Sequence, residues 1–108
     1  MIELRIYADT QGREPFTEWL AELKDIRARA IVRARLAKVQ AGNLGDCKAL
    51  RDGVQELRID YGPGYRVFLS RQGPVVVVLL CGSDKSEQAK AIKQAIANLD
   101  DWKQRGRP

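Results

Sequence analysis

Hydrophobic residues recur along the chain with two different periods, and the changes between them predict an α+β domain. Alternation with period two, typical of half-buried strands, covers residues 2–7, 55–60 and 65–70. A continuous apolar run at 75–81 is typical of a central strand that is covered on both faces. Apolar residues at helical spacing cover 15–23, 25–41 and 84–103. The predicted order is β-α-α-β-β-β-α, a small, mostly antiparallel four-stranded sheet with an N-terminal helical hairpin and a C-terminal helix.

Turn and cap residues mark the expected boundaries. Pro15 suits the first turn of a helix, and Gly42 suits the position just after one. The segment 42–53 contains three glycines and is predicted to be a loop. The last helix is expected to turn Ala89, Ile92, Ile96, Leu99 and Trp102 inward. We therefore expect one domain over residues 1–104, followed by a loose tail over 105–108.

Charge is concentrated in the middle of the chain. The formal net charge is +5, and residues 26–71 hold ten basic and four acidic groups. Such an excess indicates a polyanion or an acidic protein as partner. A solvated, arginine-rich helix explains the same composition without any partner.

The residue types that the sequence lacks exclude several kinds of catalytic and metal site. Histidine is missing, which excludes histidine-based nucleophile activation, acid–base catalysis and metal ligation. Cys47 and Cys81 form no metal-binding motif, so no metal and no cofactor are expected. The apolar run from Gly73 to Gly82 is too short to cross a membrane. The N-terminus lacks the features of a secretory signal, and we expect a cytoplasmic protein with reduced thiols.

Several short motifs, in this order and at these spacings, resemble one protein family. They are Phe16-Thr17-Glu18-Trp19-Leu20, Gln55-Glu56-Leu57-Arg58-Ile59-Asp60, Gly62-Pro63-Gly64-Tyr65-Arg66-Val67 and Gly82-Ser83-Asp84-Lys85-Ser86-Glu87-Gln88. Together they resemble the toxins of type II toxin–antitoxin modules in the RelE/ParE superfamily. The resemblance is greatest to the HigB-like, phage-derived branch known as addiction module killer proteins. It covers nearly the whole chain and implies a RelE-like fold.

The resemblance implies a cytoplasmic toxin that stops growth until an antitoxin encoded beside it binds. A helix-turn-helix protein is one candidate for that antitoxin. Most such toxins are metal-independent endoribonucleases that cleave messenger RNA on the ribosome, so the ribosome and mRNA are expected partners. The ParE branch instead poisons DNA gyrase, and an inactive domain that only binds its antitoxin is a third alternative.

Ribonuclease chemistry of this kind attacks phosphorus with the 2′-hydroxyl of the substrate and needs cations around the charged transition state. Arg58 and Arg66 lie on neighbouring predicted strands, and the period-two pattern places both on one polar face. Guanidinium groups there can bind one phosphate with two bonds each. Arg66 matches a phosphate-contacting arginine that family members carry in the same Gly-Tyr-Arg context. Lys85, at the start of the last helix, is the third candidate catalytic residue.

Other polar residues are candidates for binding RNA. Lys48 and Arg51 in the glycine-rich loop can follow the RNA backbone, Tyr61 can stack on a base, and Gln88 follows Lys85 on the last helix. Asp84 is more simply a helix cap, and Tyr65 a core residue. Ion pairs with Glu56 and Asp60 explain both arginines without any ligand. Because the chain has no histidine, the general acid and base are expected among Lys85, Glu56, Asp84 and the tyrosines, or the ribosome contributes part of this catalysis.

Overall fold

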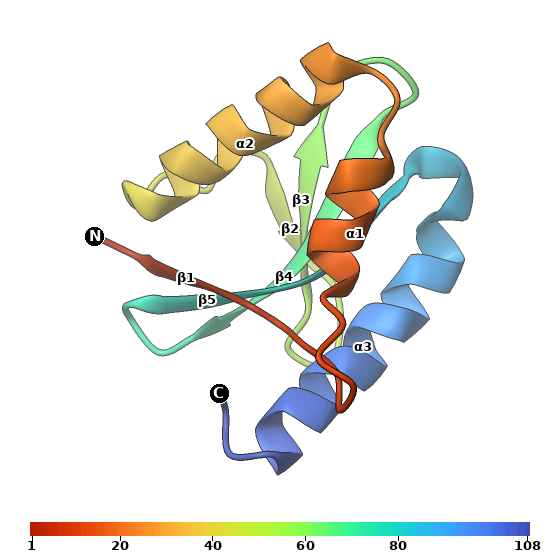
Figure 1. The fold of residues 1–108 in the computed structure, drawn as a ribbon. Helices are drawn as coiled ribbons and strands as arrows, with labels where there is room; N and C mark the ends of the chain where they lie inside the picture. The colour runs from red at the N-terminus through yellow and green to blue at the C-terminus, as the bar shows by residue number, and fades with distance from the viewer.

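The computed structural model describes residues 1–108 as a twisted sheet with helices on both faces (Figure 1). The elements are β1 (Glu3–Ile6), α1 (Pro15–Glu22), α2 (Ile26–Gln40), β2 (Cys47–Ala49), β3 (Gln55–Ile59), β4 (Tyr65–Gln72), β5 (Val76–Asp84), the 3₁₀ turn η1 (Lys85–Glu87) and α3 (Gln88–Gln104). No helix is both long and apolar enough to span a membrane.

The prediction of a four-stranded sheet was wrong. The sheet is mixed and has five strands in the order β1-β5-β4-β3-β2. The fifth strand, β2, lies inside the segment predicted to be a loop and pairs antiparallel with β3. At the other edge β1 pairs parallel with β5, with Glu3 opposite Val76 and Ile6 opposite Leu79. The helices and the three C-terminal strands form where the sequence pattern predicts them, except that β5 extends to Asp84 and α3 begins at Gln88, four residues later than predicted.

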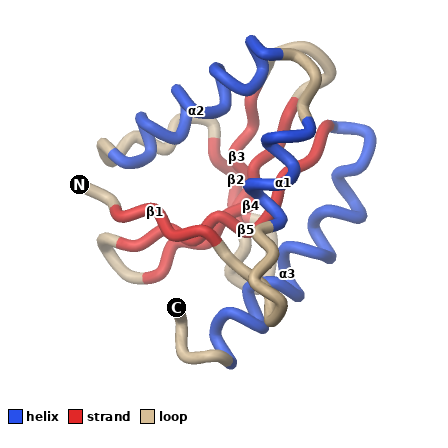
Figure 2. The backbone as a smooth tube through the Cα atoms, viewed as in Figure 1, coloured by secondary structure: helices blue, strands red, loops and turns tan.

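Each face of the sheet builds its own core, and β5 contributes to both. Figure 2 shows the strands in red between the blue helices. On one face α1 and α2 bury alternate residues of β3, β4 and β5, among them Leu57, Val67 and Leu79. On the other face α3 covers the intervening residues, among them Phe68 and Leu80. The predicted coverage of 75–81 on both sides follows from this arrangement.

The inward face of α3 differs from the predicted one. Ala89 is exposed, and the fully buried positions are Ala91, Ala95, Asn98, Leu99 and Trp102. Alanine side chains let the helix backbone approach the sheet closely. The Asn98 side-chain amide then donates to the Leu80 carbonyl at 3.0 Å, a contact that hydrophobic periodicity does not predict.

Helix α1 approaches β5 most closely at Trp19. Trp19 lies directly over Gly82, where an added Cβ would be 2.2 Å from the Trp19 ring. The ring also meets Phe16 and Tyr65 at centroid distances of 6.0 and 6.1 Å. Glycine at position 82 is therefore a packing requirement.

Candidate functional site

A wholly polar pocket opens beyond the start of α3, on the α3 side of the sheet. It measures about 430 Å³, and no hydrophobic residue lines it. We call it the arginine pocket, and its lining residues are Asp46, Arg58, Asp60, Gly62, Pro63, Gly64, Arg66 and Lys85. All three predicted catalytic residues line it, together with two carboxylates.

The sheet register brings the two arginines together. Arg58 of β3 and Arg66 of β4 are directly opposite one another in the antiparallel ladder. Their neighbours Leu57 and Val67 point into the α1–α2 core, so both arginines point to the α3 face. Side chains directly opposite in a sheet have Cβ atoms about 5 Å apart. Two guanidinium groups at that spacing can contact the same phosphate.

Arg66 is anchored over a buried carboxylate. Its side chain is 13% exposed, and its Nε lies 3.3 Å from Oε1 of Glu56, which is 2% exposed, without the alignment of a hydrogen bond. The other Glu56 oxygen accepts a 2.5 Å hydrogen bond from the Gln88 amide of α3. Arg66 Nη1 donates to the Tyr65 carbonyl at 3.2 Å. The anchored Nε leaves the Nη end of the guanidinium toward the pocket.

Arg58 is held differently, by an exposed acid. Its Nη2 and Nε donate to one Asp46 oxygen at 2.9 and 3.2 Å, and the two side chains are 42% and 57% exposed. This hydrogen bond raises the pKa of Arg58 above its ordinary value. Because the pair is exposed, an incoming phosphate competes with Asp46 at little cost. Of the two expected acidic partners, Glu56 does pair with an arginine, Arg66, whereas Asp60 makes no ion pair and Arg58 pairs with Asp46 instead.

Arg35 of α2 braces the segment that carries Asp46. Its Nη1 donates to the Arg58 carbonyl at 2.6 Å, and its Nη2 donates to the carbonyls of Leu44 and Asp46 at 2.9 and 3.0 Å. Gly45 makes room for this side chain, because an added Cβ would be 2.9 Å from Nη2. Nothing in the sequence pattern indicated this contact.

Lys85 reaches the pocket from the turn that follows β5. It is exposed and makes no ion pair or hydrogen bond with the rest of the chain. Asp84, just before it, caps the turn: its Oδ1 accepts from the backbone amides of Ser86 and Glu87 and from the Ser86 hydroxyl. The Ser86 hydroxyl lowers the pKa of Asp84 below its ordinary value. The carboxylate of Asp84 is thus occupied by the cap.

Gly64 lies between the side chains of Arg66 and Lys85. Its φ is +83°, and an added Cβ would be 3.5 Å from Arg66 Nη1 and 3.6 Å from Lys85 Cβ. The amide of Gly64 donates to the Tyr61 carbonyl at 3.0 Å, which closes the turn between β3 and β4. A glycine here satisfies the turn and keeps this wall of the pocket thin.

The candidate RNA-binding residues divide into two groups. Lys48 is exposed on β2 opposite Glu56, and Gln88 binds Glu56 directly, so both lie beside the arginine pocket. Arg51 lies in the turn before β3, at the far end of that strand from the pocket. Tyr61 donates its hydroxyl to Asp25 at the start of α2 at 2.9 Å, on the α1–α2 side. The pocket therefore includes neither Arg51 nor Tyr61.

The pocket also contains two carboxylates that sequence reasoning did not treat as site residues. Asp60 is exposed, lines the pocket, and makes no hydrogen bond or ion pair with the chain. Asp46 enters only because β2 folds back against β3. The expected general bases Glu56 and Asp84 are both engaged elsewhere, and Tyr65 is 8% exposed in the core. No three His, Cys, Asp or Glu side chains are grouped closely enough to hold a metal ion.

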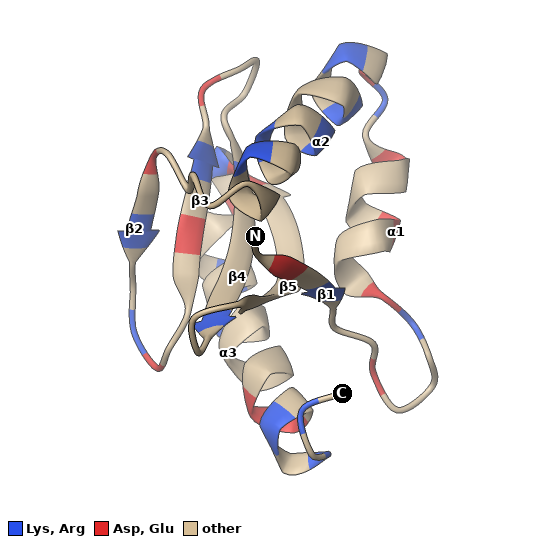
Figure 3. Cartoon of the chain, turned by 90° about the vertical axis from the view of Figure 1, so that its left-hand side faces the viewer, with Lys and Arg blue, Asp and Glu red and all other residues tan.

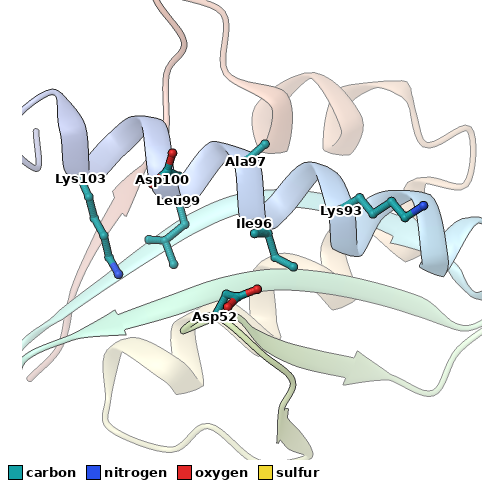
Figure 4. Close-up of a pocket in the computed structure, with 7 residues that line it drawn as sticks. All are labelled: Asp52, Lys93, Ile96, Ala97, Leu99, Asp100 and Lys103. Atoms are coloured by element: carbon teal, nitrogen blue, oxygen red, sulfur yellow. The ribbon is translucent and has the colours of Figure 1, made fainter.

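A second, larger pocket of about 550 Å³ lies between α3 and the turn before β3 (Figure 4). Its polar lining is balanced between Lys93 and Lys103 on one hand and Asp52 and Asp100 on the other. Figure 4 shows the two lysines extending from well-separated turns of α3, with Asp52 facing the helix across the gap. This arrangement concentrates no charge of one sign, so it offers less to an anionic substrate than the arginine pocket does.

Comparison with known proteins gives a relative without a functional name. No family model matches the chain. An uncharacterized protein of Haemophilus influenzae is 56% identical over 80 residues, a match that covers 74% of this chain and 81% of that protein.

Proposed function

The chain belongs to the same family as the uncharacterized Haemophilus influenzae protein, and from its arginine pocket we propose that it is the toxin of a type II toxin–antitoxin module. In this proposal the toxin is an endoribonuclease that cleaves messenger RNA on the ribosome and stops translation. It acts in the cytoplasm, where translating ribosomes are, until its antitoxin binds. The resemblance of its motifs to the RelE/ParE superfamily supports the same function.

One observation carries the proposal: Arg58, Arg66 and Lys85, which come from three different elements, line one polar pocket. Phosphoryl transfer needs positive charge placed where the transition state develops negative charge. The arginines stay charged throughout and bind phosphate oxygens through a planar fork. In this proposal Arg66 and Arg58 hold the scissile phosphate, and Lys85 contacts it from the turn that follows β5.

The pocket also offers groups that can move protons. The 2′-oxygen attacks phosphorus and loses its proton, while the bond from phosphorus to the 5′-oxygen breaks and that oxygen gains a proton. We assign the base to Asp60, because its carboxylate lines the pocket and has no partner in the chain. We assign the acid that protonates the leaving oxygen to Lys85, which also lines the pocket. The products are a 2′,3′-cyclic phosphate and a free 5′-hydroxyl.

The first test maps the 5′ ends of messenger RNA after brief induction of the toxin. Removing Arg66 alone would leave the buried Glu56 carboxylate uncompensated, at a cost of about 3–5 kcal/mol. The variant is therefore Glu56→Gln/Arg66→Gln, which removes both charges. Arg71→Gln, on the exposed end of the same strand, is the matched control.

We expect new 5′ ends inside translated frames with the native chain and with Arg71→Gln, and a loss of about 100-fold or more with the double variant. Growth arrest with intact messages would contradict the nuclease proposal, and DNA damage in those cells would indicate gyrase as the target. Absence of arrest would reduce the chain to an inactive, antitoxin-binding domain.

A further inference from the structure

The outward face of α2 is strongly basic, and the fold of the chain does not use it. Helix α2 contains five basic residues and no acidic one, and Figure 3 shows its Lys and Arg positions spread along the helix. We define the α2 face as the exposed residues Ile26, Arg27, Ala30, Arg33, Ala34, Ala37 and Lys38. The opposite side of the helix is buried against the sheet.

The α2 face has an apolar centre and charged rims. At 3.6 residues per turn, Ile26 and the three alanines fall on one stripe along the helix. Arg33 flanks this stripe on one side, and Arg27 and Lys38 flank it on the other. Ile26 is 72% exposed, which makes it one of the most exposed large apolar side chains in the chain.

The basic side chains of the rims have no hydrogen-bond or ion-pair partner within the chain. The side chains of Arg35 and Arg29 on the same helix donate to backbone carbonyls, whereas the side chains of Arg27, Arg33 and Lys38 make no hydrogen bond or ion pair. Arg27 also lies in the first turn, where the positive end of the helix dipole disfavours a cation. Basic side chains that make no hydrogen bond or ion pair within the chain indicate a surface that is available to a partner.

We propose that the α2 face is the docking surface for an acidic amphipathic helix of the antitoxin, an inference that rests on the proposed function. Alanines at the centre let a second helix approach closely, and carboxylates along both of its edges would meet the basic rims. The exposed Ile26 and the apolar stripe favour a protein helix, since a phosphate backbone gains nothing from apolar contact.

This surface is separate from the arginine pocket. Helix α2 packs on one face of the sheet, whereas Arg58 and Arg66 point to the other. The antitoxin helix therefore binds without entering the pocket. Arg35 connects the two sites, because it joins α2 to the carbonyls of Arg58 and Asp46.

The test measures the affinity of the toxin for the purified product of the gene beside its own, by titration calorimetry at about 0.1 M salt. The charge variant is Arg27→Glu/Arg33→Glu, which reverses one residue on each rim. Its matched control is Lys90→Glu/Lys93→Glu, the same charge change on the exposed side of α3. Ala34→Arg retains the native basic residues but adds one positive charge and bulk within the stripe. Circular dichroism verifies that each variant is folded.

We expect the charge variant to bind the neighbouring gene product about 100-fold more weakly than the native chain, and Ala34→Arg to bind it about 10-fold more weakly. The α3 control should bind with native affinity. Binding of the charge variant within about threefold of native would overturn the docking surface. Loss of ribosome binding with unchanged antitoxin binding would also overturn it and assign the face to RNA. If the neighbouring gene product binds no form of the toxin, the inference fails, while the 5′-end mapping decides the nuclease proposal separately.

Discussion

At the scale of single residues, Glu56 occupies a position that the polar pattern predicts to be exposed and that the structure buries. Alternation places Glu56 on the polar face of β3 with Arg58, which suggests a solvated side chain. In the structure Glu56 is fully buried, because the first turn of α3 covers it and Gln88 binds it. A buried carboxylate is retained only with a charged or hydrogen-bonding partner, and here Arg66 and Gln88 supply both. Glu56 is accordingly a positioning residue for Arg66.

Gly82 gives a residue-scale prediction about stability. Gly82→Ala would place a methyl group 2.2 Å from the Trp19 ring, inside its van der Waals radius. Since both groups are packed against the core, we expect a loss of about 1–3 kcal/mol or more in the free energy of unfolding, measured by urea denaturation.

The control for Gly82→Ala is the same change in a Trp19→Leu background. The smaller side chain leaves room for the methyl group, so the added cost of Gly82→Ala should fall below about 1 kcal/mol there. Equal costs in the two backgrounds would show that the clash is relieved elsewhere.

At the scale of elements, β2 decides the composition of the site. Three residues are too few for a recognisable alternation, and glycines on both sides favour a loop. Pairing with β3 still forms, because the β3 edge offers free backbone groups that β2 satisfies. That pairing brings Asp46 next to Arg58. An element that local sequence does not predict therefore supplies one wall of the arginine pocket.

The three hydrogen bonds of Arg35 predict how α2 affects the site. Arg35→Lys removes the fork that binds three carbonyls at once, and an ammonium group cannot reproduce that geometry. We expect faster amide hydrogen exchange over residues 44–49 and a loss of about 10-fold or more in mRNA cleavage, because Arg58 and Asp46 shift.

Arg29→Lys, on the same helix, is the control for Arg35→Lys, because Arg29 makes only a 3.4 Å contact with the Ala21 carbonyl. Arg35→Lys with native cleavage but faster exchange would mean that the brace serves the fold alone.

At the scale of the whole molecule, the two ends of the chain are fastened to each other. The Tyr7 hydroxyl, just after β1, donates to Asp101 of α3 at 2.7 Å. Arg105 lies 2.9 Å from Asp101, stacks 5.7 Å from the Tyr7 ring centre, and donates to the Ala8 carbonyl. Burial, together with the Asp101 carboxylate, raises the pKa of Tyr7 to about 12.

This contact predicts a dependence of stability on alkaline pH. Because the pKa of Tyr7 is higher in the folded state, its contribution is complete below about pH 10 and is lost as the pH rises toward about 12. Tyr7→Phe should lower Tm by about 5 °C at neutral pH. The difference from the native chain should shrink between pH 10 and 12 in calorimetric scans. A constant difference for Tyr7→Phe would contradict the assignment.

Local periodicity is enough to predict the helices, the three C-terminal strands, the burial of β5 on both faces and the shared polar face of Arg58 and Arg66. Long-range packing is needed to explain the parallel pairing of β1, the existence of β2, the burial of Glu56 and the separation of Arg51 and Tyr61 from the pocket. Each of these depends on contacts between residues distant in sequence. Unpaired backbone groups and buried charges take their partners from whichever residues the packed chain brings near. Local sequence patterns do not predict those partners.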